Sequence, residues 1–254
     1  MMDKKIIVSI TFDDGNEEDF TIFWPMLKKY NLRGTFYVIT DQIGLKGKLT
    51  FEQLNILYKN GNEIGSHTHT HPRLTRLDDK RVEFELRKSK EVLAEFNPRT
   101  LAYPDGDYDN RVIKFVKKYY QAARGFNPPY PDIPQSYGIN ENLDSRYSLK
   151  VLNIEDILNL IDIRAVNPWV ITVIHSGMYP KVNIDMVKWY IKRKGLQASY
   201  LKSLILYLKY LIRGRQEQKA KNRIYECFFR YISECPKFKV LTVSEALDYF
   251  QGDK

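Results

Sequence analysis

The hydrophobic residues of this chain fall into short apolar runs that alternate with longer stretches of helical spacing. The first run, 6–12, is rich in β-branched residues and stops at Asp13-Asp14-Gly15, which predicts a buried strand that ends in a turn. Similar runs predict strands at 34–39, 63–66, 99–103, 169–174 and 238–242. Apolar residues at helical spacing predict helices at 20–30, 50–60, 78–96, 110–120, 154–165 and 244–250. Several prolines predict a loop at 130–135.

Strands and helices that alternate in this way are typical of repeated βα units around a parallel sheet. A chain of 254 residues suits one barrel of such units, so we expect a single domain over residues 1–254. The interval 183–235 departs from the alternation because its composition favours helix throughout. We therefore interpret 183–235 as a helical insertion that precedes the last βα unit.

Positive charge is concentrated in the same interval. The net charge is +9, and residues 181–239 hold 15 Lys and Arg against 4 Asp and Glu. Such a segment is most often a solvated helical face, but it also suits contact with an anionic surface. Within it, 199–213 carries a broad apolar face, which favours packing on the barrel or on a second subunit. The sharper hypothesis is contact with a membrane surface that presents a lipid-linked sugar. We expect no nucleic-acid partner.

The chain shows no pattern of export or membrane insertion. It contains no apolar run of 18 or more residues. The short apolar stretch near its N-terminus is not followed by a small-residue cleavage site. We therefore expect a cytoplasmic protein, with a peripheral place at the membrane as the alternative. Cys227 and Cys235 are too few for a disulfide framework, and we interpret them as reduced thiols.

The four histidines give the sharpest chemical signal. Three lie within Ser66-His67-Thr68-His69-Thr70-His71-Pro72, and the fourth, His175, follows a predicted strand. Two imidazoles four residues apart in a turn can reach one ion, and imidazole is the commonest nitrogen ligand of zinc. The pair Asp13-Asp14 supplies the charge balance. One carboxylate can bind a cation while its neighbour faces a bound water as a general base.

The positions of these residues support one shared site. In barrels of βα units, catalytic groups lie at the carboxyl ends of the strands. The chemically useful residues all follow predicted strands, namely Asp13-Asp14, His67, Pro104-Asp105-Gly106 and His175. Because four strand ends agree, the pattern predicts a metal-dependent hydrolase more firmly than any one motif would.

Four ordered segments resemble the motifs of the polysaccharide deacetylases, which are carbohydrate esterase family four with the NodB-homology domain. They are Thr11-Phe12-Asp13-Asp14-Gly15, the His67–His71 motif, Ala102-Tyr103-Pro104-Asp105-Gly106 and Val173-Ile174-His175. The resemblance covers about residues 5–180 and resumes at 242–246, leaving the insertion outside it. It implies an α/β fold, a distorted (β/α) TIM-like barrel of seven strands. It also implies removal of N-acetyl groups from an oligosaccharide, a sugar nucleotide or a lipid-linked glycan, with release of acetate.

The resemblance further implies roles for individual residues. Asp14, His67 and His71 would bind a divalent metal, for which we favour Zn²⁺ over Co²⁺, Ni²⁺ or Mn²⁺. Asp13 would be the general base that takes a proton from the attacking water. His175 would be the general acid that protonates the departing amine.

The third motif departs from the common family pattern. The backbone N–H of Asp105 would match the donor that stabilises the oxyanion, at a position where many members have Tyr. Many members also have Arg where this chain has Ala102, and that arginine steadies the base. Another arginine must then take its place, and Arg124 and Arg146 are the candidates.

Two polar residues keep open roles. His69 matches a variable position of the second motif, and we expect it to be a bystander or to line the groove. Asp144 either orients His175 or is a surface residue.

Two other functions stay open beside sugar deacetylation. The same barrel can host hydrolysis of a non-sugar C–N amide bond. Alternatively, the chain is a non-catalytic homologue that binds a glycan or a lipid. The intact metal ligands and the general acid argue against the non-catalytic alternative, because a binding protein has no need of this ion site.

Overall fold

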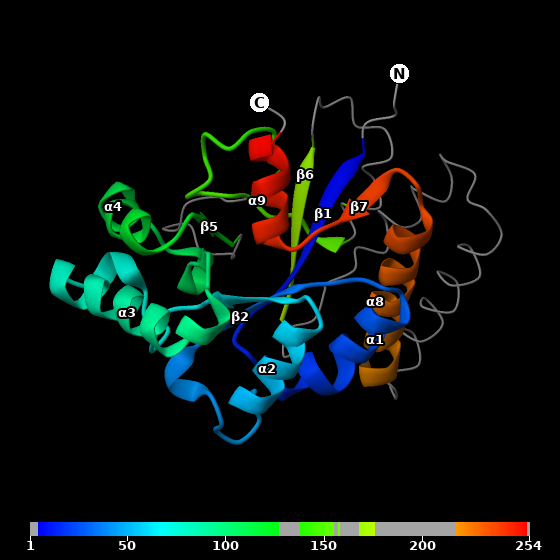
Figure 1. Cartoon of the computed structure of the whole chain (residues 1–254), viewed down its shortest axis with the longest axis horizontal. Coiled ribbons are helices and arrows are strands. Elements are labelled where there is room, and N and C mark those ends of the chain that lie inside the picture. The colour runs from blue at the N-terminus through cyan, green and yellow to red at the C-terminus, as the bar shows by residue number, and fades with distance from the viewer. Residues whose placement is uncertain (1–4, 127–137, 155–156, 158–167, 176–216, 253–254) are drawn as a thin grey trace.

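The structure is a computed structural model that describes residues 5–126, 138–154, 157, 168–175 and 217–252 (Figure 1). Within these ranges a parallel sheet curls into a half-barrel that helices surround. Its strands are β1 (Ile6–Phe12), β2 (Thr35–Val38), β3 (Glu63–Ser66), β4 (Thr100–Ala102), β5 (Ala122–Arg124), β6 (Trp169–Ile174) and β7 (Phe238–Val240). Its helices are α1 (Trp24–Lys29), α2 (Phe51–Lys59), α3 (Asp79–Val92), α4 (Asn110–Tyr119), α8 (Glu217–Glu234) and α9 (Val243–Gly252).

The sheet has the order β5-β4-β3-β2-β1-β6, and β7 pairs with the first half of β1. All its pairings are parallel, so the carboxyl ends of the strands meet at one edge. Strand β1 lies between neighbours on both sides, and every one of its residues is buried. The described residues form seven strands, which confirms the prediction of a distorted (β/α) barrel.

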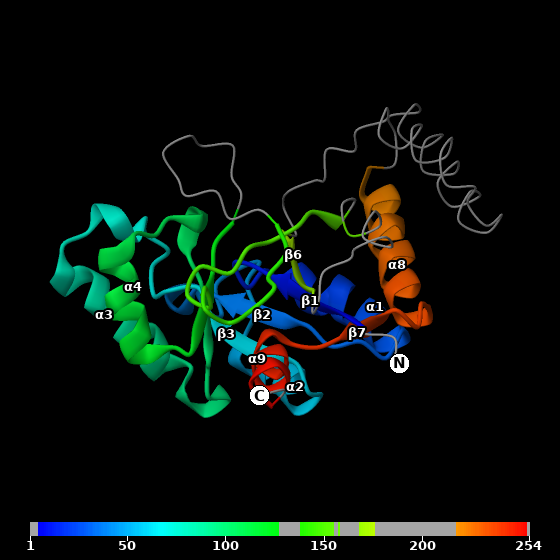
Figure 2. The same cartoon turned by 90° about the horizontal axis from the view of Figure 1, so that it is seen from above.

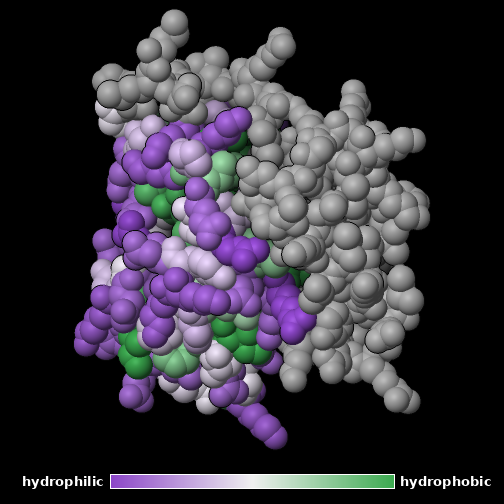
Figure 3. Space-filling model, turned by 90° about the vertical axis from the view of Figure 1, so that its right-hand side faces the viewer, coloured by the Kyte–Doolittle hydropathy of each residue, from purple (hydrophilic) through white to green (hydrophobic). Residues whose placement is uncertain are grey.

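The helices cover the sheet with their apolar faces. Figures 1 and 2 show α3 and α4 side by side at one end of the sheet, and α1 and α8 side by side at the other. Phe12 and Phe36 stack in the core at 4.6 Å between ring centroids. On the face in Figure 3, polar residues cover most of the described surface, and apolar residues form only small separate patches.

Local sequence explains where the helices begin and end. Thr50 caps α2, because its hydroxyl accepts from the Gln53 amide while the Gln53 side chain accepts from the Thr50 amide. The predicted helix 20–30 instead starts with a π-helical turn, Asp19–Phe23, ahead of α1. The predicted helix 78–96 is shorter than expected: α3 ends at Val92, and a separate 3₁₀ turn, Ala94–Phe96, is followed by Asn97, whose φ of 46° is left-handed.

Strand β5 was not predicted, because its sequence Ala-Ala-Arg has no hydrophobic signal. Strands β1, β3 and β6 have the bounds that the apolar runs predict. The loop 130–135, most of the helix 154–165 and the insertion before residue 217 lie outside the described residues. Helix α8 confirms the helical prediction for the last part of the insertion.

The predicted contact of 183–235 with a membrane surface or a second subunit stays a prediction, since most of that interval is not described. In the described part of the chain, no helix is both long and apolar enough to cross a bilayer. The single domain over residues 1–254 also stays a prediction.

Candidate active site

Three potential metal-binding atoms converge at the carboxyl edge of the sheet. Oδ1 of Asp14 lies 3.5 Å from Nε2 of His67 and 3.7 Å from Nε2 of His71. The two Nε2 atoms lie 3.2 Å apart. Asp14 comes from the turn after β1, and both histidines come from the loop after β3. The structure therefore brings together the three residues that the sequence nominates as metal ligands.

The chemistry of these donors fits a divalent cation. Bonds of about 2.0–2.1 Å to a tetrahedral zinc ion set the ligand atoms about 3.3 Å apart, close to the three distances. Nδ1 of His67 lies 2.8 Å from the carbonyl oxygen of Ala102, which can only accept, so Nδ1 carries the proton. Its Nε2 then presents a lone pair to the cluster. Burial lowers the pKa of His67 to about 4, so the ring is neutral, the form that binds metals.

The backbone adopts a costly conformation at each ligand loop. Asp14, Thr68 and His71 have φ values of 74°, 66° and 61°. Such left-handed conformations cost roughly 1–3 kcal/mol for residues other than glycine and persist only where the surroundings enforce them. The amide of His71 donates to the Thr68 hydroxyl at 3.1 Å, and the amide of Thr68 donates to the Ser66 hydroxyl at 3.2 Å. These bonds within the loop favour its strained shape.

Lys48 holds the loop that carries Asp14. Its ammonium donates to the backbone oxygen of Asp14 at 3.1 Å and to the side-chain oxygen of Asn16 at 2.8 Å. The adjacent Leu49 amide donates to the backbone oxygen of Gly15 at 2.9 Å. The segment after β2 therefore fixes the turn after β1.

Asp13 lies buried between the side chains of Arg124 and His175. One carboxylate oxygen forms an ion pair with Arg124, which is fully buried, and the other lies 3.4 Å from Nε2 of His175. Burial alone would raise the pKa of Asp13. The positive charge of Arg124, which also donates a hydrogen bond to the carboxylate, is the largest effect that opposes burial, and the pKa of Asp13 is held below its usual value. Asp13 is therefore an ionised carboxylate that can accept a proton.

Two further contacts hold the Arg124 side chain in place. Its guanidinium lies 4.7 Å from the ring centroid of the buried Tyr37, and Nη1 donates to the backbone oxygen of Gly125 at 3.2 Å. Arg124 is the register partner of Ala102 on the neighbouring strand β4. An arginine on β5 thus stands beside the small residue where the resemblance leads us to expect one on β4.

The turn after β4 carries Asp105 at the same edge of the sheet. Asp105 is exposed, with a φ of 54°. The next two amides donate to the carbonyl oxygens of Tyr103 and Pro104 at 2.9 Å, which makes the turn tight. Gly106 has a φ of 70°, and a Cβ there would lie 2.8 Å from the backbone of Phe126. The backbone of this turn is therefore closely confined.

The sequence profile of the polysaccharide deacetylases matches residues 2–133, just over half of the chain. The chain belongs to the polysaccharide deacetylase family. The metal-ligand candidates and Arg124 lie inside the matched interval, and His175 lies beyond it.

Curated relatives match part of this chain. The YxkH protein of Bacillus subtilis is 35% identical over 114 residues, which are 44% of this chain and 41% of YxkH. A peptidoglycan-N-acetylglucosamine deacetylase of Bacillus cereus is 29% identical over 119 residues, 44% of this chain and 41% of that protein. The matched segment thus spans less than half the length of each of these two relatives.

Solved structures share the fold of this chain. The peptidoglycan deacetylase PdaC of Bacillus subtilis aligns with a TM-score of 0.56 at 16% identity, over 98% of this chain and 93% of that one. The Streptococcus pyogenes deacetylase PplD, in complex with acetate, aligns with a TM-score of 0.52 at 21% identity, over 71% of this chain and 68% of that one. At these identities the likeness concerns the fold alone.

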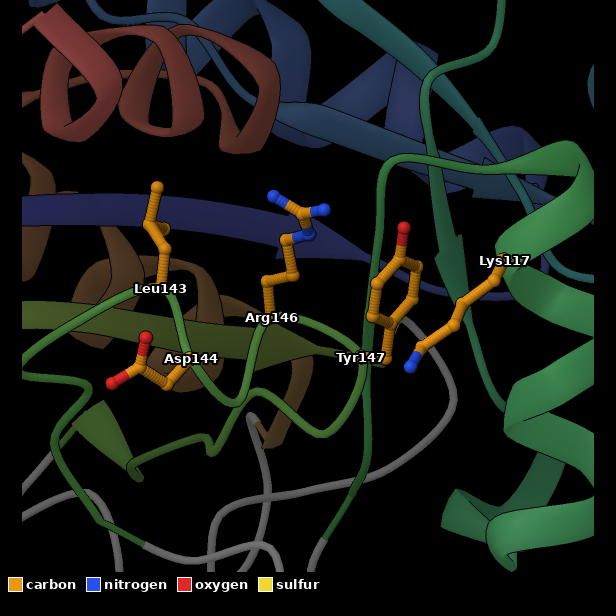
Figure 4. Close-up of a pocket in the computed structure, with 5 residues that line it drawn as sticks. All are labelled: Lys117, Leu143, Asp144, Arg146 and Tyr147. Atoms are coloured by element: carbon orange, nitrogen blue, oxygen red, sulfur yellow. The ribbon is translucent and has the colours of Figure 1, made fainter.

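Of the two candidate arginines, the structure brings Arg124 to Asp13 and places Arg146 elsewhere. The Arg146 guanidinium lies 5.3 Å from the Tyr147 ring centroid in a shallow pocket of about 370 Å³. In Figure 4, Arg146 and Tyr147 extend to the same side of their loop, while the carboxylate of Asp144 points away. Within the described residues, no ion pair joins Asp144 to His175, and Asp144 is exposed.

His69 does not join the metal-ligand cluster. Its Nδ1 lies 2.9 Å from the Thr40 hydroxyl, and its ring lies edge-on to Phe84 at 5.8 Å. This placement agrees with the expectation of a bystander or a residue at the rim of the groove.

Sequence reasoning missed several residues around the site, chiefly the buried Tyr37, Asp19 and Glu85 and the partly buried Lys48. Glu85 alone left a signal, because it interrupts the apolar stripe of the helix predicted at 78–96. The others become recognisable only when distant strands are placed side by side.

Proposed function

We propose that this polysaccharide deacetylase is a metal-dependent hydrolase that removes N-acetyl groups from an N-acetylated sugar and releases acetate. The observation that carries the proposal is one arrangement at the carboxyl edge. Three convergent metal donors stand beside a buried, ionised carboxylate that faces a third histidine. This arrangement offers a cation site, a proton acceptor and a proton donor within one site.

Asp14, His67 and His71 would hold the metal, with Zn²⁺ favoured by the two imidazoles. When bound there, a divalent metal supplies Lewis acidity that polarises the acetyl carbonyl and acidifies a water molecule.

Asp13 accepts the proton that the attacking water loses. Arg124 keeps Asp13 ionised and aimed, because it pairs with one carboxylate oxygen and leaves the other directed towards His175. The new C–O bond forms as the water proton moves to Asp13.

The leaving amine then needs a proton, and His175 gives one to the amide nitrogen as the C–N bond breaks. The water oxygen ends in acetate, and the sugar nitrogen leaves as an amine. The backbone N–H of Asp105 donates to the carbonyl oxygen while that oxygen carries negative charge. A backbone donor needs no particular side chain, so the Asp at this position is compatible with the role.

The substrate class rests on the relatives. The family is described as polysaccharide deacetylase, and the Bacillus cereus relative is named for peptidoglycan N-acetylglucosamine. We therefore propose a sugar-linked acetamide as the substrate of this chain, within an oligosaccharide, a sugar nucleotide or a lipid-linked glycan.

The test is acetate release from a panel of N-acetylglucosamine oligosaccharides, sugar nucleotides, lipid-linked glycans and non-sugar acetamides. We expect release from at least one sugar substrate, loss of release on chelation, and recovery on adding Zn²⁺. Release confined to non-sugar amides would contradict the sugar assignment. Bound metal without hydrolysis of any substrate would favour the non-catalytic alternative.

Two histidine variants of the same loop test the metal ligands. His71→Asn removes an imidazole but keeps a residue that tolerates a left-handed φ, and we expect it to abolish metal binding and acetate release. His69→Gln is the matched control, because this side chain lies outside the cluster, and we expect near-normal metal content. Equal loss of metal in both variants would refute the ligand assignment.

A further inference from the structure

The loop from His67 to His71 needs an external anchor. Two of its residues, Thr68 and His71, have left-handed backbone conformations, and Thr68 is β-branched, for which that conformation is a genuine outlier. A loop of this shape relaxes unless its polar groups are bonded from outside. Because the loop delivers both imidazoles of the proposed metal site, its shape decides whether the two rings can meet at one ion.

Glu85 supplies that anchor from helix α3. Its Oε2 accepts from the amides of His69 at 3.0 Å and of Thr70 at 2.8 Å, and its Oε1 accepts from the Thr70 hydroxyl at 2.7 Å. The residue is only 1% exposed. Within the described residues, no ion pair joins it to an arginine or a lysine. Its charge is therefore balanced by the N–H and O–H groups of the loop, and such charge-assisted bonds are strong.

The anchor acts at the middle of the loop, between the two ligands. Two consecutive amides on one oxygen fix the peptide planes on both sides of His69, so the chain cannot twist there. On the other side of the loop, the carbonyl oxygens of Thr68 and His69 accept from the amides of Thr40 and Asp41 at 3.2 and 3.0 Å. The loop is thus held between the segment after β2 and the buried carboxylate of α3.

We propose that Glu85 is a positioning residue that sets the metal affinity of the site by fixing the loop between His67 and His71. The inference rests on the proposed metal-dependent function. It adds that the strength of ion binding depends on a carboxylate that never touches the ion. Outer partners of this kind change metal affinity about 10–100-fold when they are removed.

The experiment compares Glu85→Ala, Glu85→Gln and the matched control Glu91→Ala in the full chain. Glu91 is an exposed glutamate on the same helix, paired with Arg87. Zn²⁺ affinity is measured by competition with a chromophoric chelator, and amide hydrogen exchange of His69 and Thr70 is measured in metal-free protein.

We expect Glu85→Ala to weaken Zn²⁺ binding about 10–100-fold and to speed exchange of both amides at least about tenfold. Glu85→Gln should stay within about threefold of the wild type, because its amide oxygen can still accept from both N–H groups. Glu91→Ala should change neither quantity. Folded Glu85→Ala with unchanged Zn²⁺ affinity would overturn the proposal.

A general loss of stability must be separated from loss of loop geometry. Leu247→Ala empties part of the core beneath α9, away from the histidine loop, and serves as a destabilised reference. If it weakens Zn²⁺ binding as much as Glu85→Ala does, the positioning role is refuted. If the wild type binds no divalent ion, the proposed function fails, while amide exchange still decides whether Glu85 holds the loop.

Discussion

The two edges of the sheet differ in how they bond their carboxylates. At the amino edge, Glu63 on β3 accepts four hydrogen bonds, from the hydroxyls of Thr35, Thr100 and Ser244 and from the amide of Ser244. At the carboxyl edge, one oxygen of the fully buried Asp19 accepts from the Asn16 amide, and the other has no partner among the described residues.

The difference separates a structural network from a site. The amino edge satisfies its polar groups and ties α9 to three strands, so it stabilises the fold. At the carboxyl edge, the lone pairs of Asp14, His67 and His71 face one another, and Asp14 and His71 keep strained backbone conformations. Both features cost stability and are typical of functional sites. The polar groups of the sheet are therefore hydrogen-bonded at its amino edge, whereas at its carboxyl edge some stay free to bind a ligand.

Breaking the buried ion pair of the carboxyl edge should have the largest effect. Arg124→Met leaves Asp13 as an unpaired buried charge, and we expect a loss of about 3–5 kcal/mol in the free energy of unfolding, measured with urea. Acetate release should fall as well, since Asp13 loses its alignment. The double variant Asp13→Asn with Arg124→Met should recover much of the stability and none of the activity. Strictly additive losses would show that the pair is not coupled.

Removing the Glu63 carboxylate at the amino edge should cost less stability and leave the metal site unchanged. Glu63→Ala deletes the acceptor of four hydrogen bonds, and we expect about 2–4 kcal/mol of destabilisation in urea unfolding. Zn²⁺ affinity should stay within about twofold. A large drop in affinity at equal folding would show that the two edges are not independent.

Neutralising Asp19 should stabilise the protein in a pH-dependent way. Burial raises the pKa of Asp19 well above its usual value, with the charges of Asp13 and Asp14 adding to the effect. Below about pH 3.9 the folded and unfolded states are both protonated, so Asp19→Asn gains nothing. As the pH rises, the unfolded wild type ionises first and the wild type loses stability. We expect the metal-free variant to gain about 1 kcal/mol at pH 7 in thermal unfolding. An equal gain at pH 3.5 would contradict this explanation.

The smallest effect should come from the exposed ion pair of the amino edge. Arg99 binds Asp248 of α9 through two hydrogen bonds, of 2.7 and 2.5 Å. Asp248→Ala should cost about 0.2–1 kcal/mol, and the cost should shrink in 0.5 M salt. If salt leaves the loss of stability unchanged, Asp248 stabilises the fold through packing and not through its charge.

Features of the fold and the site were predictable from the sequence where they depend on residues close together in the chain. The bounds of β1, β3 and β6 followed from apolar runs that stop at polar residues. The metal-ligand candidates stood out because histidines are rare in this chain and cluster in one motif. The structure then placed those residues together.

Features that depend on register between distant strands were not predictable. Arg124 was one of two candidate arginines, and only the pairing of β5 with β4 shows that it stands beside Ala102. Glu85 interrupts the apolar stripe of the helix predicted at 78–96, which marks it as unusual, but its partners lie in another segment. Local sequence patterns indicate which residues are buried and whether a segment is helix or strand. Which arginine pairs with Asp13 is decided by the tertiary fold.

The position of β1 has a consequence for how the chain acquires its shape. It precedes the other described strands along the chain, yet it takes partners from residues 169–174 and 238–240. Contacts so distant in sequence slow folding, because large loops must close before they form. Until residues 238–240 have been synthesised, part of the apolar β1 lacks a neighbouring strand, and the nascent protein is then exposed to aggregation and dependent on chaperones.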